Sequence, residues 1–141
     1  MTPVGTRRLY RPDPTSVGVH EQWGAASAEA RRSQDTLVVF VRGEVDAANC
    51  GRLADYLERH AAIAENFVVD TSAVDFFAAS ALAVLHRVDS CCTRGGMTWR
   101  LVAGHAVGRV MRLCGTEDLP QAENLEAALH QADSPPVSVV G

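Results

Sequence analysis

The chain has 141 residues and a formal net charge of −4, and its 47% hydrophobic and 21% charged residues are typical of one globular domain that can bury a core. All 13 basic residues are arginine, which excludes enzymes that need a lysine amine, such as P-loop nucleotide hydrolases, pyridoxal enzymes and protein kinases. No apolar run reaches the roughly 18 residues of a membrane helix, and the four cysteines show neither CxxC spacing nor the density of a disulfide scaffold, so we expect a cytoplasmic protein with reduced thiols.

The two ends of the chain lack the periodicity of helices or strands. Three prolines and many polar residues precede Trp23, and a pair of prolines lies near the C-terminus. The expected organisation is a flexible N-terminal tail at 1–24, one domain at 25–132 and a C-terminal tail at 133–141.

Charge is distributed unevenly along the chain. Residues 1–32 carry five arginines and three acidic residues, whereas residues 33–141 carry eight arginines and fourteen acidic residues. Arg7, Arg8 and Arg11 could bind an acidic group, although a solvated tail also explains them. The acidic remainder, with its scattered arginines, argues against nucleic acid as a partner.

Strand and helix patterns alternate through the first half of the domain. Small and charged residues alternate over 28–32, which predicts a weak edge strand. The β-branched run Leu37–Val41, ended by Gly43, predicts a buried strand. A helix is expected from Asp46, a good N-cap residue, to about Ala64. Its apolar face has four-residue spacing at Leu53, Leu57 and Ala61.

The alternation continues in the second half. Phe67–Asp70 predicts another buried strand, and Ser80–Arg94 predicts a helix that the following two glycines terminate. A strand at 98–103, a helix at about 106–113 and a last helix capped by Asn124 complete the series. This order predicts an α/β single domain with a mostly parallel, four- to five-stranded sheet and about four helices.

Three segments in this order form a recognisable pattern. They are Gly43-Glu44-Val45-Asp46, the run from Val69 to Phe77, and Gly95-Gly96 before a strand. With them, the chain resembles the STAS domain of bacterial anti-sigma-factor antagonists, a domain that also occurs in sulfate transporters. The resemblance covers residues 28–131 without large gaps and implies the STAS fold.

The resemblance also implies a function. Members of the family dock on an anti-sigma factor, often an ATP-using serine kinase, and so free a sigma factor for transcription. Phosphorylation of a serine breaks the docking, because phosphoserine adds roughly −1.5 to −2 charges at the interface. The chain is therefore expected to be a binding module and not an enzyme, needing no cofactor or metal, without contact to a membrane, and a monomer or weak dimer.

The family's phosphorylation motif, Asp-Ser-Ser-Gly, is altered here to Ala78-Ala79-Ser80-Ala81. Ala79 has no hydroxyl, so the usual phospho-acceptor is missing. Ser80 matches the second serine; at the start of a helix it could accept a phosphate, which the backbone amides would stabilise, or it could simply cap the helix. Docking either survives, leaving a permanently competent antagonist, or has been lost with these groups.

The remaining interface residues are expected near this corner. An N-cap role explains Asp46, yet in the family its corner adjoins the docking surface. Because neighbouring side chains of a strand face opposite ways, one of Phe76 and Phe77 should fill the core and the other should join the docking patch. The predicted interface residues are Asp46, Asn49, Asp75 and Phe77.

Other readings of the same residues remain open. Ser80 follows a strand and begins a helix, as in the nucleophile elbow of α/β-hydrolases, with His86 or His105 and Asp70 as partners, but alanine and leucine replace the elbow's glycines. Cys91 and Cys92 could act with His86 as a thiol sensor or half a metal site, although packing explains them more simply. A STAS scaffold or a small-ligand or nucleotide sensor without a phospho-switch is a further alternative.

Overall fold

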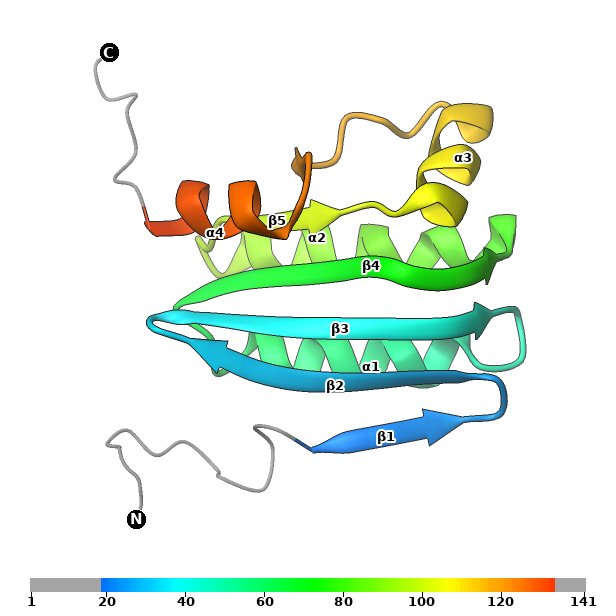
Figure 1. The fold of residues 1–141 in the computed structure, drawn as a ribbon, viewed down its shortest axis with the longest axis horizontal. Coiled ribbons are helices and arrows are strands. Elements are labelled where there is room, and N and C mark those ends of the chain that lie inside the picture. Colours follow the sequence, from blue (N-terminus) through cyan, green and yellow to red (C-terminus); the bar gives the residue numbers. More distant parts are fainter. Residues whose placement is uncertain (1–18, 134–141) are drawn as a thin grey trace.

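The computed structural model describes residues 19–133, which form a central sheet with helices on both sides (Figure 1). The elements in chain order are β1 (His20–Trp23), β2 (Ala26–Ser33), β3 (Thr36–Val45), α1 (Cys50–Ala61), β4 (Asn66–Phe77), the 3₁₀-helix η1 (Ala79–Ala81), α2 (Leu82–Arg94), β5 (Trp99–Val102), α3 (His105–Cys114), β6 (Gln121–Ala122) and α4 (Leu125–Asp133).

The six strands lie in the order β1-β2-β3-β4-β5-β6. The pairs β1–β2 and β2–β3 are antiparallel, and the remaining three pairs are parallel. The predicted α/β fold with a mostly parallel sheet and four α-helices is therefore confirmed. The sheet has more strands than the expected four to five because short strands, β1 and β6, extend it at both edges.

The edge of the sheet at β1 corrects two predictions. Residues 20–23 were expected in a flexible tail, but they pair with β2, and the Tyr56 hydroxyl in α1 donates a 2.6 Å hydrogen bond to the Val19 carbonyl. The predicted edge strand at 28–32 lies inside the sheet, between β1 and β3. Most of the predicted N-terminal tail, including Arg7, Arg8 and Arg11, and residues 134–141 lie outside the described residues.

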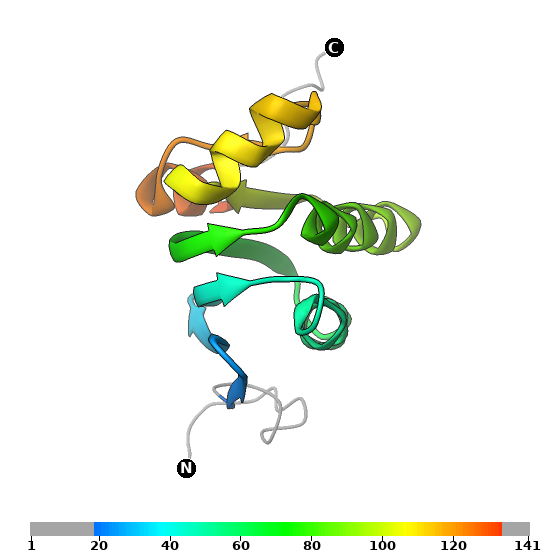
Figure 2. The same cartoon turned by 90° about the vertical axis from the view of Figure 1, so that its right-hand side faces the viewer.

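The helices cover the two faces of the sheet unequally (Figure 2). α1 and α2 lie on one face, where their apolar sides join alternate strand residues such as Val39 and Val69 in the main core. The predicted apolar face of the second helix is buried as expected, from Ala81 to Cys92. On the other face α4 packs Ala128 against Val38, Val68 and Val102. That face is left without a helix over the C-terminal half of β3.

The two central strands are longer than predicted, and the pairing between them is irregular at two places, each with an extra residue in β4. Gly43 does not end β3: it has φ +89° inside the strand, and a Cβ there would collide with the Ala25 carbonyl. The β3–β4 register shifts between Phe40 and Arg42 and again between Gly43 and Glu44. Bulges absorb the irregularity and let the pairing continue to Val45.

The observed helix ends lie close to the predicted ones, with differences of a few residues at the starts of α1 and α2. α1 begins at Cys50 and not at Asp46, because a turn at 46–49 intervenes. The second predicted helix begins with the 3₁₀ turn η1 before α2. Gly115 ends α3 with φ +69°, and the Asn124 side chain accepts a 2.8 Å bond from the Ala127 amide at the start of α4, as expected.

Candidate partner-binding surface

The C-terminal ends of β3 and β4 form one continuous edge of the molecule. In the register of these parallel strands Glu44 pairs with Phe76 and Val45 pairs with Phe77. The Ala78 amide then donates a 2.9 Å bond to the Val45 carbonyl, so the pairing extends into the following loop. The turn at 46–49 and the corner at 78–81, far apart in sequence, are thereby held side by side.

The turn at 46–49 is stabilised by its own side chains. One carboxylate oxygen of Asp46, Oδ1, accepts bonds from the amides of Ala48 (2.9 Å) and Asn49 (3.1 Å). Asp46 therefore caps this turn and not the helix itself, and its side chain is half-buried. Among residues 19–133 no hydrogen bond or ion pair forms at the second carboxylate oxygen, so Asp46 can serve both roles that its position suggested.

Asn49 lies inside the structure, which the sequence did not predict. Its side chain is only 7% exposed; Oδ1 accepts the Asp46 amide at 2.9 Å, and Nδ2 donates to the carbonyls of Glu44 at 3.0 Å and Trp23 at 3.3 Å. With its amide group occupied in this way, Asn49 connects the β3–α1 turn to the β1–β2 hairpin. Asn49, predicted as an interface residue, therefore supports this edge from within.

The two phenylalanines face opposite sides, as expected, and Phe77, the one predicted for the interface, is the one that faces the core. Phe77 is 4% exposed and belongs to the main core, whereas Phe76 is 51% exposed. The pairing explains the difference: Phe77 lies beside the buried Val45, and Phe76 lies beside the exposed Glu44. Phe76 is therefore the aromatic side chain available at this edge.

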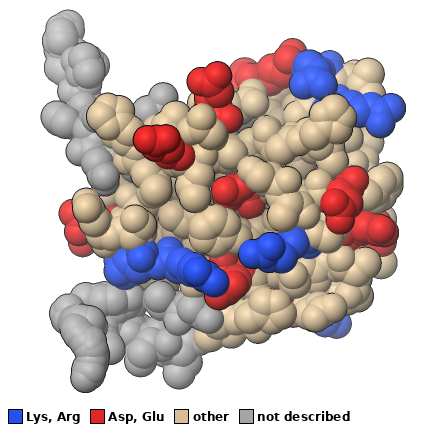
Figure 3. Space-filling view, in the orientation of Figure 1, with Lys and Arg blue, Asp and Glu red and all other residues tan. Residues whose placement is uncertain are grey.

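The corner at 78–81 is open to solvent at its centre. Ala79 and Ser80 are exposed, Ala78 is half-buried, and Ala81 is buried in the core. Asp75 is exposed shortly before them on β4. Figure 3 shows acidic side chains at the edge where β3 and β4 end. Position 79, where the resemblance predicts a phospho-acceptor, is thus accessible, but Ala79 offers only a methyl group.

A bulge in β4 places the neighbouring helix α3. The Asp70 carboxylate accepts the Ser72 amide at 2.8 Å, and the Thr71 hydroxyl donates to the Val102 carbonyl at 2.8 Å and accepts the Gly104 amide at 3.2 Å. β4 therefore continues beyond the end of β5, and α3 packs beside that extension.

The alternative catalytic arrangement is not assembled. Asp70 is buried and bonded to the Ser72 amide, while His86 and His105 are exposed on different helices. Within residues 19–133, no hydrogen bond joins Ser80 to either histidine. The same part of the chain contains no group of three or more His, Cys, Asp or Glu side chains placed to hold a metal ion.

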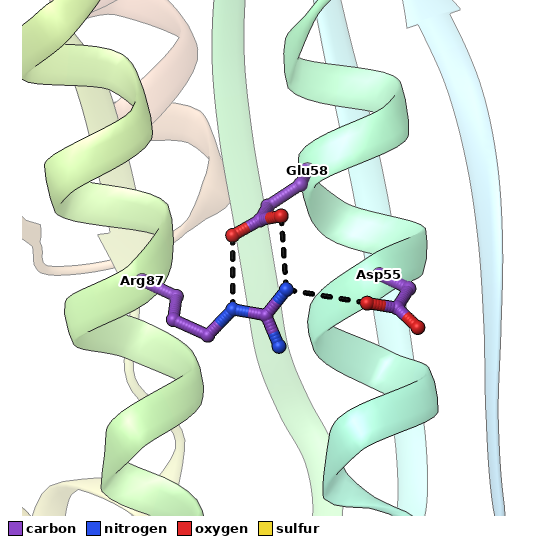
Figure 4. A network of polar contacts seen from close by, with 3 residues as sticks. All are labelled: Asp55, Glu58 and Arg87. Atoms are coloured by element: carbon purple, nitrogen blue, oxygen red, sulfur yellow. Dashed lines mark hydrogen bonds and ion pairs between the residues drawn. The ribbon is translucent and has the colours of Figure 1, made fainter.

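A second polar cluster lies on the helical face, away from this edge (Figure 4). The Arg87 guanidinium of α2 donates two 2.9 Å bonds to Glu58 of α1 and one of 3.2 Å to Asp55. A shallow groove beside it is lined by Glu58, Ala83, His86, Arg87, Ser90 and Arg94. The cluster joins two helices, and its charged groups are already paired.

None of the helices within residues 19–133 has both the length and the apolar character required to cross a membrane.

Comparison with known proteins gives a consistent result. The family model of the STAS domain matches residues 27–132. Osmosensory protein A of Mycobacterium tuberculosis is 31% identical over 115 residues, covering 77% of this chain and 72% of that protein. The anti-sigma-F factor antagonist RsfA of the same species is 34% identical over 110 residues, or 74% of this chain and 86% of the relative.

A solved structure agrees with these sequence matches. The crystal structure of an anti-sigma factor antagonist from Mycobacterium paratuberculosis superposes with a TM-score of 0.65 at 23% identity, covering 77% of this chain and 95% of that one. At this identity the similarity concerns the fold.

Proposed function

The chain belongs to the STAS domain family, and from this premise we propose that it is an anti-sigma factor antagonist that binds its anti-sigma factor through the C-terminal edge of β3 and β4. The binding surface consists of Asp46, Asp75, Phe76 and the corner at 78–81. The antagonist acts by reversible protein contact, without chemistry on the partner.

One observation carries this proposal: the turn after β3 and the corner after β4 are exposed together at one edge, with an aromatic side chain between acidic groups. An aromatic anchor with a polar rim is a common arrangement in protein interfaces. The 34% identical relative named as an anti-sigma-F factor antagonist supports the same assignment.

The alanine at position 79 leads to a finer proposal about regulation. Phosphorylation cannot occur there, so docking is not switched at this position. We infer that the antagonist remains competent to bind once it is made, and that the amount of protein sets its effect. Ser80, exposed in η1, is the remaining hydroxyl of the corner.

The binding proposal is tested by calorimetric titration of this protein with each anti-sigma factor of the organism that encodes it. We expect one of them to bind the wild type, and Ala79→Glu to weaken that binding at least about tenfold, because a carboxylate would lose its water at the interface. The matched control is Ala62→Glu, the same change at an exposed alanine between α1 and the start of β4. This position lies at the opposite end of β4 from the proposed binding surface. If no anti-sigma factor binds the wild type, the function is wrong; if both variants bind like the wild type, the surface is wrong.

A phosphorylation assay with the binding anti-sigma factor and ATP tests the regulatory proposal, provided that this factor is a kinase. We expect no phosphate on the wild type and phosphate on Ala79→Ser, which restores the acceptor hydroxyl. Phosphate on the wild type that is lost in Ser80→Ala would contradict the proposal and assign the switch to Ser80. Equal incorporation in the wild type and Ser80→Ala would exclude Ser80.

A further inference from the structure

On the face of the sheet opposite α1 and α2, no helix covers the C-terminal part of β3 (Figure 1 and Figure 2). Arg42 pairs with Ala73, and Glu44 pairs with Phe76, so these four side chains share that face. All four are exposed, and Asp75 is exposed beside them. We call these five residues the open-face patch. Phe76, at 51% exposure, is one of two exposed large hydrophobic side chains in residues 19–133, the other being Leu113 on α3.

The carboxylates of the open-face patch are not neutralised within the folded part. Four acidic side chains of the described part form ion pairs with arginines, namely Glu21, Glu29, Asp55 and Glu58. Among the described residues, no ion pair forms at Glu44 or Asp75. Asp46, two residues after Glu44, adds a third carboxylate at this edge, against one patch cation, Arg42. An exposed aromatic side chain among carboxylates without ion pairs favours binding of a segment that is cationic and partly apolar.

The chain itself contains a segment with that chemistry. Residues 7–11 read Arg-Arg-Leu-Tyr-Arg, so three cations flank two apolar side chains. Residues 1–32 have an excess of two positive charges, while residues 33–141 have an excess of six negative charges. The opposite signs of the two parts favour their contact.

The covalent connection is long enough for this contact. The described chain begins at Val19, held on α1 by the Tyr56 hydroxyl. From there to Phe76 is roughly 16 Å along the strands and roughly 14 Å across three strand spacings, or about 22 Å in all. The eight residues from Arg11 to Val19 span up to about 29 Å when extended. Arg11 and the residues before it can therefore reach the patch around the β1 edge.

We propose that residues 7–11 bind the open-face patch of the same molecule, with their arginines on Glu44, Asp46 and Asp75 and with Leu9 and Tyr10 over Phe76. The bound segment covers part of the edge through which the anti-sigma factor is proposed to dock. It therefore competes with the partner, and this regulatory consequence rests on the proposed function, whereas the contact itself does not.

NMR amide spectra of the full chain without any partner test the contact. The wild type is compared with a variant in which Arg7, Arg8 and Arg11 are changed to glutamine. We expect shift differences at 42–46 and 72–76 that vanish at about 1 M salt, where the screening length is about 3 Å. The control variant with lysine at the same three positions keeps the charges and should retain most of the wild-type shifts.

Three outcomes overturn the proposal. The first is that the spectra of the wild type and the glutamine variant coincide, and the second is that their differences are confined to other surfaces. The third is that the differences disappear on dilution, which would assign the contact to a second copy of the chain. A Phe76→Ala variant provides a check from the other side, since it should reduce the same shift differences without loss of the fold.

Titration with the anti-sigma factor then tests the competition. We expect the glutamine variant to bind about fivefold or more tightly than the wild type, a typical size for coupling between two sites. Equal affinities would overturn the competition. Absence of any binding would instead count against the proposed function and leave the NMR result standing, so the two failures are distinguishable.

Discussion

Because Gly104 has no side chain, the start of α3 can lie close to the backbone of β4. Gly104 joins β5 to α3, and a Cβ at this position would lie 2.7 Å from both the Ser72 Cα and the Thr71 carbonyl oxygen. Both atoms belong to the backbone of the β4 bulge and cannot move aside cheaply. The close approach allows the Gly104 amide to donate to the Thr71 hydroxyl.

We therefore expect Gly104→Ala to lower the free energy of unfolding by about 1–3 kcal/mol, as overpacking does elsewhere. Urea denaturation measures this. Gly51→Ala is the matched control: it lies in α1 with nothing within 4 Å of the added methyl, and it should stabilise the helix by up to about 1 kcal/mol. Equal stabilities of Gly104→Ala and the wild type would contradict the packing described here.

Cys92 has an altered acidity because it is buried in the core. Burial raises the pKa of its thiol to about 12, and Cys91 and Asp89 act in the same direction. In the unfolded chain the pKa of a cysteine thiol is about 8.5. The folded pKa is the higher of the two. The contribution of the neutral thiol to stability is therefore fully present below the unfolded pKa, and it is lost as the pH rises from there toward the folded pKa.

Stability measured at pH 8 and at pH 10 tests this linkage. We expect the wild type to lose about 2 kcal/mol more than Cys92→Ala over this interval, since only the wild type has this thiol to ionise on unfolding. The comparison uses the slopes, because the alanine variant also loses packing at every pH. Parallel slopes for the two proteins would show that Cys92 does not contribute.

At the scale of elements, α1 and α2 are joined by Arg87 as well as by their apolar faces (Figure 4). Its bonds to Glu58, and then to Asp55, raise the pKa of the guanidinium, which stays charged. The Arg87 side chain is 44% exposed, so water screens the pair and its contribution is small.

A double-mutant cycle of Arg87→Gln and Glu58→Gln measures that contribution. We expect a coupling of about 0.5–1 kcal/mol at low salt, falling toward zero as salt is added. Arg94→Gln in place of Arg87→Gln is the control on the same helix, because no hydrogen bond joins Arg94 to Glu58 in the described part of the chain. A coupling unaffected by salt would contradict a screened surface pair.

At the scale of the whole molecule, the centre of the sheet should be its most stable part. β3 and β4 are paired on both sides, while β1 and the two-residue β6 are edge strands. Local opening is easiest where few partners must be broken.

Hydrogen exchange followed by mass spectrometry tests this order. We expect the slowest exchange in peptides from β3 and β4, and faster exchange in β1 and β6. Tyr56→Phe, which removes the hydrogen bond to Val19, should speed exchange in β1 but leave β4 unchanged. Protection of β1 equal to that of β4 would contradict a stability that decreases toward the edges.

The local pattern of the sequence was sufficient for much of this architecture. β-branched runs predicted the central strands, and four-residue spacing predicted the helix faces, because burial of one face is a property of neighbouring residues. Gly115 and Asn124 marked helix ends through their own backbone and side-chain chemistry. The absence of a hydroxyl at Ala79 is likewise a fact of the sequence.

Only the tertiary structure decided which side chains the edge presents. Phe77 lies inside because it pairs with the buried Val45, and Phe76 lies outside because it pairs with the exposed Glu44, contrary to prediction. Gly43 continues its strand because the Ala25 carbonyl packs against it, and Asn49 is buried because Trp23 and Glu44 offer it acceptors. Each of these outcomes depends on pairing between strands distant in sequence, which no local periodicity encodes.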